Sequence, residues 1–175
     1  PGHGDTGVDS HLALPTIAVS RERMDSVELP PFRDAIAAGM GAIMTAHITV
    51  PSINGGTGDA ATLSPRVLTG LLRDELGFRG IVFTDAMDMA AISGRLGSGE
   101  AAVRAVLAGA DVILMPASVE QAAKGLVDAV RSGRISAERL DASVLLLLRT
   151  KESLGLHRER EVALERVHAT VGSPA

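Results

Sequence analysis

The sequence predicts an α/β fold in which short parallel strands alternate with helices. Three short apolar runs, at residues 41–46, 80–83 and 110–115, are separated by longer segments whose apolar residues recur at helical spacing. Such alternation requires right-handed crossover connections and produces a parallel sheet. A complete eight-stranded α/β barrel takes about 250 residues. The 175 residues of this chain therefore predict a partial (β/α)8 barrel of the TIM type, roughly its second half.

The first part of the chain predicts a loop and then a helix in two pieces. Residues 1–15 carry Gly and Pro without an apolar period, which is typical of a loop. Residues 20–39 have helical character with Ser20 as the N-cap, and the prolines at positions 30–31 divide the helix. The chain then enters its first strand, at 41–46, directly from this helix.

A loop, a helix and a second strand follow in the middle of the chain. His47 stands at the carboxyl end of the first strand, and residues 54–59 form a glycine-rich loop without the Gly-Lys-Ser/Thr of a phosphate cradle. Ser64 is placed to cap a helix over 65–77, whose first position is proline. The next strand, at 80–83, follows this helix.

The last part of the chain continues the alternation. It comprises a helix within 97–109, a strand at 110–115, a helix at 118–133 and a helix at 136–154. Ser118 and Gln121 form a capping-box pattern at the start of the third of these. We expect residues 1–156 to form one domain and residues 157–175 to form a charged linker or tail.

Composition limits the classes of function. Apolar residues make up 46% of the chain, which indicates a globular fold. The net charge of -4 without a basic stripe argues against nucleic acid as a partner. The chain has no cysteine, which excludes thiol catalysis, disulfides and cysteine–zinc sites. No apolar run approaches the roughly 20 residues of a membrane helix, so we expect no membrane contact.

A carboxylate follows the strand at 80–83. In α/β barrels the chemistry takes place at the carboxyl edge of the strands, which makes Asp85 the first catalytic candidate. The alternative is that Asp85 caps a short helical turn over 87–92, as aspartate often does. Asp88 would lie on the same side of such a turn, and a solvated or capping role suits it better.

A second group of ionisable side chains lies in the first loop. Asp9 is two residues from His11, and a carboxylate there can hydrogen-bond the ring, fix its tautomer and favour its protonated form. A histidine held in this way can give a proton to a leaving group and then take one from water.

Two other kinds of site have little support. His3, His11 and His47 could bind a metal with the carboxylates, but the chain has no HExxH motif and no helical pair of histidines at i, i+4. It also lacks the Gly-x-Ser-x-Gly elbow of a serine hydrolase. We therefore expect no metal.

Four ordered blocks of residues are together more specific than any one of them alone. They are Pro1-Gly2-His3-Gly4-Asp5 with Asp9-Ser10-His11 and Leu14-Pro15, then Met44-Thr45-Ala46-His47, then Phe83-Thr84-Asp85-Ala86-Met87-Asp88-Met89, then Ala108-Gly109-Ala110-Asp111 through Pro116. The first block resembles the signature Lys-His-Phe-Pro-Gly-His-Gly with Asp-Ser-His of glycoside hydrolase family 3, in its β-N-acetylglucosaminidase branch. The other blocks are similar to further parts of that family, so the resemblance covers nearly the whole chain.

The resemblance implies a retaining exo-glycosidase that removes terminal β-linked N-acetylglucosamine from peptidoglycan fragments (muropeptides) or chitooligosaccharides, without a cofactor. By position, Asp85 would be the nucleophile that forms a glycosyl-enzyme, and His11, oriented by Asp9, would be the acid/base. The residues that would shape or contact the sugar site are His3, His47 and Met87. For His47 a loop-positioning contact is the alternative.

Several alternatives stay open. They are a β-glucosidase specificity within the same family, phosphorolysis in place of hydrolysis, and a non-catalytic fragment. The triplet at 9–11 argues against the glucosidase branch, which usually takes its acid from a glutamate in a later domain. The family pattern also implies a Lys-His-Phe before Pro1 and earlier strands that grip the sugar hydroxyls. We therefore expect a fragment whose partner is the missing N-terminal half of the barrel and which has little activity alone. The resemblance fits both a cytoplasmic and an exported bacterial protein.

Overall fold

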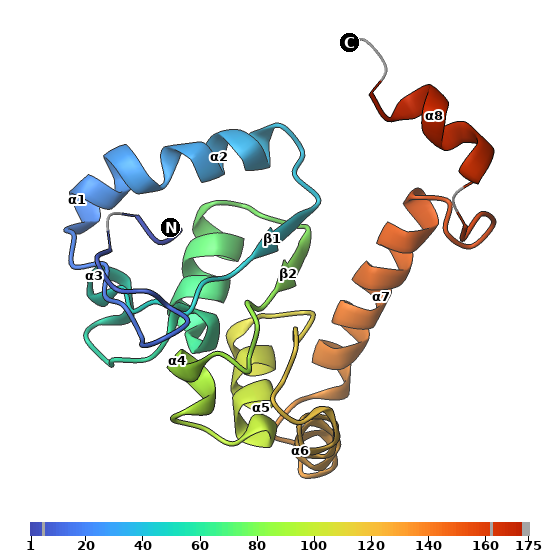
Figure 1. The fold of residues 1–175 in the computed structure, drawn as a ribbon. Coiled ribbons are helices and arrows are strands. Elements are labelled where there is room, and N and C mark those ends of the chain that lie inside the picture. Colours follow the sequence, from blue (N-terminus) through green and yellow to red (C-terminus); the bar gives the residue numbers. More distant parts are fainter. Residues whose placement is uncertain (5, 162, 173–175) are drawn as a thin grey trace.

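Two parallel strands with helices around them make up the computed structural model (Figure 1). The structure describes residues 1–4, 6–161 and 163–172, so Asp5 of the first loop and the end of the predicted tail lie outside the described residues. The mixed α/β class that the alternating pattern predicts is confirmed at this level.

The strands are short, and the helices vary in length and type. The strands are β1 (Ala42–Met44) and β2 (Ile81–Phe83). The α-helices are α1 (Arg21–Arg23), α2 (Pro30–Ala37), α3 (Pro51–Asn54), α4 (Ala90–Ser93), α5 (Ser98–Ala108), α6 (Val119–Arg131), α7 (Ala137–Ser153) and α8 (Val167–Thr170). The segments η1 (Met24–Glu28) and η3 (Arg66–Glu75) are π-helical, and η2 (Ala61–Leu63) and η4 (Leu164–Arg166) are 3-10 helices. Within the described ranges, no helix is both long and apolar enough to cross a bilayer.

The two strands pair side by side in the parallel direction that the helical crossovers require. Ala42 lies opposite Ile81, and the register continues over three residue pairs. An isolated parallel bridge between Thr16 and Thr49 brings the end of the first loop against the segment that follows β1. The residues around Thr16 were not expected to take part in any sheet contact, since they lie between the predicted loop and the predicted first helix.

The segment predicted as a third strand, 110–115, is not a strand. It makes a single-residue parallel bridge to β2, and further backbone hydrogen bonds join residues 111–115 to residues 82–88. Side chains take the hydrogen-bonding positions on either side of this bridge. The Asp111 carboxylate accepts the N–H of Val82 at 2.9 Å, and the hydroxyl of Thr84 accepts the N–H of Leu114 at 2.8 Å. The prediction was wrong because side-chain acceptors replace part of the backbone ladder.

Two of the three predicted serine caps are confirmed. The hydroxyls of Ser20 and Ser118 each accept a backbone N–H three residues later, and Ser136, for which no cap was predicted, does the same. The predicted cap at Ser64 is wrong, because its hydroxyl instead donates to the side-chain oxygen of Asn54 at 2.9 Å. This bond ties the end of α3 to the start of η3.

Buried apolar side chains from β2, η3 and α5 form the main core. Val82, Leu68 and Ala105 represent these elements and are between 0% and 2% exposed. A smaller apolar cluster fills the space between α5 and α6. These two helices meet closely, because a Cβ added at Gly125 would lie 2.7 Å from the Cα of Gly99.

A buried ion pair joins elements that are distant in the sequence. The Nη2 atom of Arg73, on η3, lies 2.7 Å from Oδ2 of Asp111, whose side chain is only 5% exposed. The hydroxyl of Ser143, on α7, donates to the other carboxylate oxygen at 2.6 Å. With the Val82 contact described above, this carboxylate connects η3, β2 and α7.

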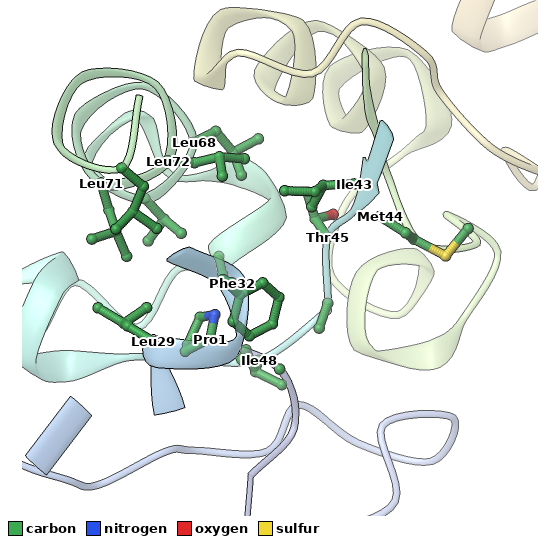
Figure 2. A pocket seen from close by; sticks show the side chains of 15 residues that line it. Pro1, Leu29, Phe32, Ile43, Met44, Thr45, Ile48, Leu68, Leu71 and Leu72 are labelled. Atoms are coloured by element: carbon green, nitrogen blue, oxygen red, sulfur yellow. The ribbon is translucent and has the colours of Figure 1, made fainter. Parts of the chain in front are cut away.

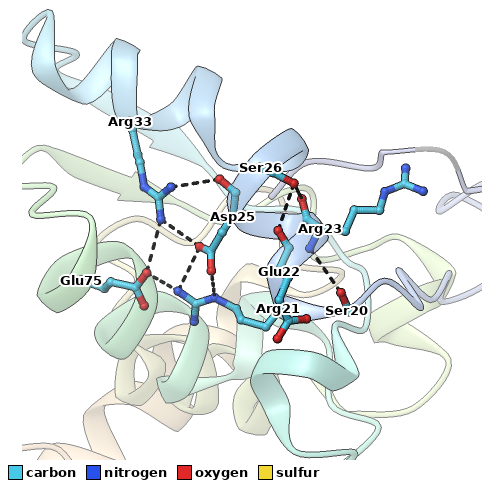
Figure 3. A network of polar contacts seen from close by, with 8 residues as sticks. All are labelled: Ser20, Arg21, Glu22, Arg23, Asp25, Ser26, Arg33 and Glu75. Atoms are coloured by element: carbon cyan, nitrogen blue, oxygen red, sulfur yellow. Dashed lines mark hydrogen bonds and ion pairs between the residues drawn. The ribbon is translucent and has the colours of Figure 1, made fainter.

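A second polar network, on the surface, holds α1, η1 and α2 against η3 (Figure 3). Asp25 accepts hydrogen bonds from Nε of Arg21 at 2.8 Å and from Nη2 of Arg33 at 2.9 Å. Arg21 also pairs with Glu75 of η3. The hydrogen bond from Arg21, with a further contribution from Arg33, lowers the pKa of the Asp25 carboxyl. Because these side chains are partly solvated, each pair adds little stability by itself.

Candidate active site

Asp85 lies two residues beyond the carboxyl end of β2. The preceding residue, Thr84, is fully buried, and its N–H donates to the carbonyl of Val112 at 3.0 Å. Asp85 itself is half-buried, and its Oδ1 atom accepts the N–H of Ala86 at 2.8 Å. It does not cap a helix over 87–92, because α4 begins only at Ala90 and has no side-chain cap. The Asp85 carboxylate therefore has no helix-capping role, and it follows β2 at the carboxyl edge of the sheet.

The loop after Asp85 is fixed by backbone hydrogen bonds to the neighbouring segment. The N–H groups of Met87 and Asp88 donate to the carbonyls of Leu114 and Met115, each at 3.0 Å. The Met87 side chain, predicted to contact substrate, is 3% exposed and belongs to the apolar core. In this structure the buried Met87 side chain therefore anchors the loop that follows Asp85 to the apolar core.

His47 is fully buried, and both of its ring nitrogens have partners. Nε2 lies 2.9 Å from the carbonyl oxygen of Ala86, and Nδ1 lies 2.9 Å from the hydroxyl of Thr62. Burial lowers the pKa of His47, while the hydrogen bond to Ala86 and the charge of Asp85 act in the opposite direction and the charge of His3 adds to the lowering. The ring is therefore held neutral beside the Asp85 loop.

The first loop contains a hydrogen-bonded pair of the kind that acid/base catalysis uses. Nδ1 of His11 lies 2.8 Å from Oδ1 of Asp9, and the same oxygen accepts the backbone N–H of His11 at 2.9 Å. The backbone bond and then the ring bond lower the pKa of Asp9. Both side chains are more than half exposed, at 74% for His11 and 57% for Asp9. Nε2 of His11 thus stays open to solvent.

His3 links the first loop to the neighbourhood of Asp85. Its Nε2 atom lies 2.9 Å from the hydroxyl of Ser10, which is buried. Its charge also contributes to the pKa of both Asp9 and His47, and the pKa of His47 responds to Asp85 as well. The charge of His3 therefore acts on both Asp9 and His47. In the described part of the chain, no hydrogen bond or ion pair joins Asp85 directly to His11.

Sequence inspection missed two threonines that support this region. The hydroxyls of Thr45 and Thr62 lie 2.8 Å apart, and Thr62 also reaches the carbonyl of Ala46 at 3.1 Å. A fully buried threonine inside the apolar run 60–63 was the available signal, because a buried hydroxyl needs a partner.

Among the residues that the structure describes, no three His, Asp or Glu side chains are grouped so as to hold a metal ion.

The comparison with known families is decisive. The sequence pattern of the glycosyl hydrolase family 3 N-terminal domain matches residues 1–150. The chain belongs to glycosyl hydrolase family 3. The resemblance of the four sequence blocks to this family is thereby confirmed.

Related family 3 proteins cover the whole chain. The chain is 34% identical over 194 residues to beta-hexosaminidase A of Pseudoalteromonas piscicida, a match that covers 100% of this chain and 32% of that protein. It is 32% identical over 182 residues to a beta-N-acetylglucosaminidase/beta-glucosidase of Cellulomonas fimi, again with 99% and 32% covered. A solved family 3 beta-N-acetylglucosaminidase from Paenibacillus sp. str. FPU-7 superimposes with a TM-score of 0.88 at 51% identity, over 94% of this chain and 32% of that one. The chain thus spans about a third of the length of these family 3 proteins.

An apolar cavity lies beside the segment that leads from β1 to His47. Its volume is about 80 Å³, and it lies between α2, β1 and η3 (Figure 2). Its lining is mostly aliphatic and includes Phe32, Ile43, Leu68, Leu72 and Pro1. None of the predicted catalytic residues lines it, and no charged side chain does.

Proposed function

We propose that the protein containing this chain is a retaining exo-glycosidase. It removes terminal β-linked N-acetylglucosamine from peptidoglycan fragments or chitooligosaccharides. The observation that carries the proposal is the contact of 2.8 Å between Nδ1 of His11 and Oδ1 of Asp9. The relatives named as beta-hexosaminidase or beta-N-acetylglucosaminidase support the choice of sugar, although one of them is also named a beta-glucosidase.

In the first step, an oxygen of Asp85 attacks the anomeric carbon of the sugar. The bond from this carbon to the leaving-group oxygen breaks, and the Nε2–H of protonated His11 gives that oxygen its proton. The product is a glycosyl-aspartate. In the second step, water attacks the same carbon, His11 takes a proton from the water, and Asp85 leaves as a carboxylate. The two displacements together retain the β configuration.

The Asp9–His11 contact favours these roles for chemical reasons. Asp9 accepts from Nδ1–H of the ring, so Nε2 is the nitrogen that exchanges protons with the substrate. The carboxylate of Asp9 also stabilises the imidazolium, which the acid step needs. A histidine in place of a second carboxylate beside Asp85 avoids repulsion between like charges.

We further propose that the two-stranded arrangement is the second half of an eight-stranded barrel. β2 covers one edge of β1, while Ala42 and Met44 on β1 are exposed, Met44 by 56%. The apolar cavity of Figure 2 lies beside β1. A further parallel strand there would cover an edge that soluble proteins rarely leave open. The leucines on α7, such as Leu145 and Leu148, are also about half exposed and would pack against the same neighbouring half.

The substrate-contacting roles of His3, His47 and Met87 belong to this proposal. His3 is exposed and supports a direct contact with the sugar. His47 and Met87 are buried, which supports contact through the loops that they hold.

The proposal is tested by turnover of an aryl β-N-acetylglucosaminide and of a chitooligosaccharide. The protein that includes the preceding half-barrel should release N-acetylglucosamine with retained configuration, as proton NMR of the first-formed anomer shows. The 175-residue chain should be poorly active. A complete protein that cleaves aryl glucosides but not N-acetylglucosaminides, or that inverts the anomer, would contradict the proposal.

A further inference from the structure

The buried ring of His47 forms a bridge between the segment after β1 and the loop that carries Asp85. A ring nitrogen can hydrogen-bond to a carbonyl oxygen only if it carries a proton. The Nε2 atom, 2.9 Å from the carbonyl oxygen of Ala86, is therefore protonated. The same carbonyl also accepts the N–H of Met89 at 3.2 Å. Two donors therefore hold the carbonyl of the residue that directly follows Asp85.

On the other side of the ring, Nδ1 of neutral His47 is an acceptor 2.9 Å from the hydroxyl of Thr62, whose single proton it shares with the carbonyl of Ala46 at 3.1 Å. Thr62 in turn contacts Thr45, at the end of β1. The network thus runs from β1 through Thr62 and His47 to Ala86. The His47 and Thr62 side chains in this network are both 0% exposed.

We infer that His47 is a positioning residue for Asp85 and that it acts through its Nε2–H···O=C bond to Ala86. The peptide units on both sides of Ala86 are then held, since the Asp85 carboxylate accepts the Ala86 N–H at 2.8 Å and His47 bonds the Ala86 carbonyl of the next unit at 2.9 Å. These two bonds hold the backbone directly after Asp85. The kinetic part of the inference rests on the proposed function, whereas the part that concerns loop geometry does not.

Matched substitutions separate the two sides of the ring. In His47→Gln, the side-chain amide nitrogen is as many bonds from the backbone as Nε2 of histidine, so the bond to Ala86 can be kept. In His47→Asn, the amide group reaches only the position of Nδ1, so the bond to Thr62 can be kept and that to Ala86 is lost. Thr62→Val removes the Thr62 bond and leaves Nε2 in place.

The experiment measures kcat, KM and the hydrogen exchange of the 85–89 segment in the complete protein. His47→Asn should lower kcat by about 100-fold, the cost of a small misplacement of a reacting group. Its KM should not change, and exchange in this segment should accelerate. His47→Gln should recover most of both losses. Thr62→Val should lower the melting temperature with kcat close to that of wild type.

Three results would overturn the inference. One is equal loss in His47→Gln and His47→Asn, and another is a loss of kcat in Thr62→Val as large as in His47→Asn. The third is a raised KM at unchanged kcat, which would indicate direct contact with substrate. If wild type cleaves no N-acetylglucosaminide, the proposed function fails, and hydrogen exchange alone decides the positioning role. If His47→Asn does not fold, 15N NMR of wild type decides, since a His47 ring protonated only at Nδ1 would refute the inference.

Discussion

Nδ1 of His11 lies 2.8 Å from Oδ1 of Asp9, and the same carboxylate oxygen also accepts the backbone N–H of His11. One oxygen of Asp9 thus holds both the ring and the backbone N–H of His11, although both side chains are well exposed to solvent. The pair needs no other element to form, because its members are two residues apart. It is therefore a local unit that the short sequence Asp-Ser-His determines.

His11→Ala should slow natural oligosaccharides more than activated aryl glycosides. A poor leaving group needs the proton that His11 supplies, and loss of a general acid typically costs about 10²–10⁴-fold. Phenolate leaving groups of low pKa need little help. Steady-state kcat/KM on both substrate types measures this difference, with Leu12→Ala, at an exposed neighbour, as the control. Equal losses on both would argue against an acid role for His11.

Asp85→Asn should reduce turnover by at least about 10³-fold, as removal of a covalent nucleophile does in other enzymes. The amide keeps the size of the side chain, so the fold should be retained. Asp88→Asn is the matched control, because Asp88 is exposed and only its backbone is bonded to the neighbouring segment. Retention of most activity by Asp85→Asn, at unchanged circular dichroism, would exclude the nucleophile role.

Burial of His47 predicts a loss of stability at acid pH. Its pKa in the folded protein is lowered from 6.5, chiefly by burial. As the pH falls through about 6.5, the unfolded chain therefore binds a proton before the folded one does. Stability should decrease with falling pH until the folded pKa is also passed. Urea midpoints between pH 7.5 and pH 5 measure this. His47→Gln should show a smaller decrease, and an unchanged pH slope would refute the explanation.

Asp111→Ala should destabilise the chain by about 3–5 kcal/mol, the usual effect of breaking one side of a buried ion pair. It leaves Arg73, whose side chain is 17% exposed, and the N–H of Val82 without their acceptor. The control is Asp128→Ala on α6, where the ion pair with Lys124 is exposed and little change in the urea midpoint is expected. Similar midpoints for the two variants would show that the buried network adds no stability.

Gly125→Ala should weaken the packing of α5 against α6. The added Cβ would lie 2.7–2.9 Å from the backbone of Gly99, so the helices must separate, at about 1–3 kcal/mol. Gly70→Ala in η3 is the control, because its nearest contact would be 3.9 Å away and alanine favours the helix. Thermal unfolding of both variants tests the contrast, and a fully stable Gly125→Ala would show that the helices can shift freely.

Local signals in the sequence predicted most of the elements. Apolar runs located β1 and β2, and the predicted cap at Ser118 located the start of α6, because strand burial and caps depend on few neighbouring residues. The third strand and the Ser64 cap were predicted wrongly. In both places a side chain bonds to a partner far away in sequence or in another element, namely Asp111 to Val82 and Ser64 to Asn54. No local pattern reports such contacts.

The candidate site divides in the same way. The Asp9–His11 contact could be predicted, because it depends on three consecutive residues. The burial of His47 and Met87 could not, because it depends on segments that fold over them from elsewhere in the chain. The catalytic roles of Asp85, His11 and Asp9 stay predictions until the substitutions above are measured.

The guanidinium of Arg73 also grips the carbonyl of Gly80, at 2.6 Å, immediately before β2, whereas Asp85 follows just after this three-residue strand. Arg73, which anchors β2, and Asp85, the proposed nucleophile, thus act at opposite ends of the same strand. Stabilising substitutions around Arg73 should therefore raise thermal stability without altering the chemistry at Asp85. Stability and catalytic turnover can then be changed independently.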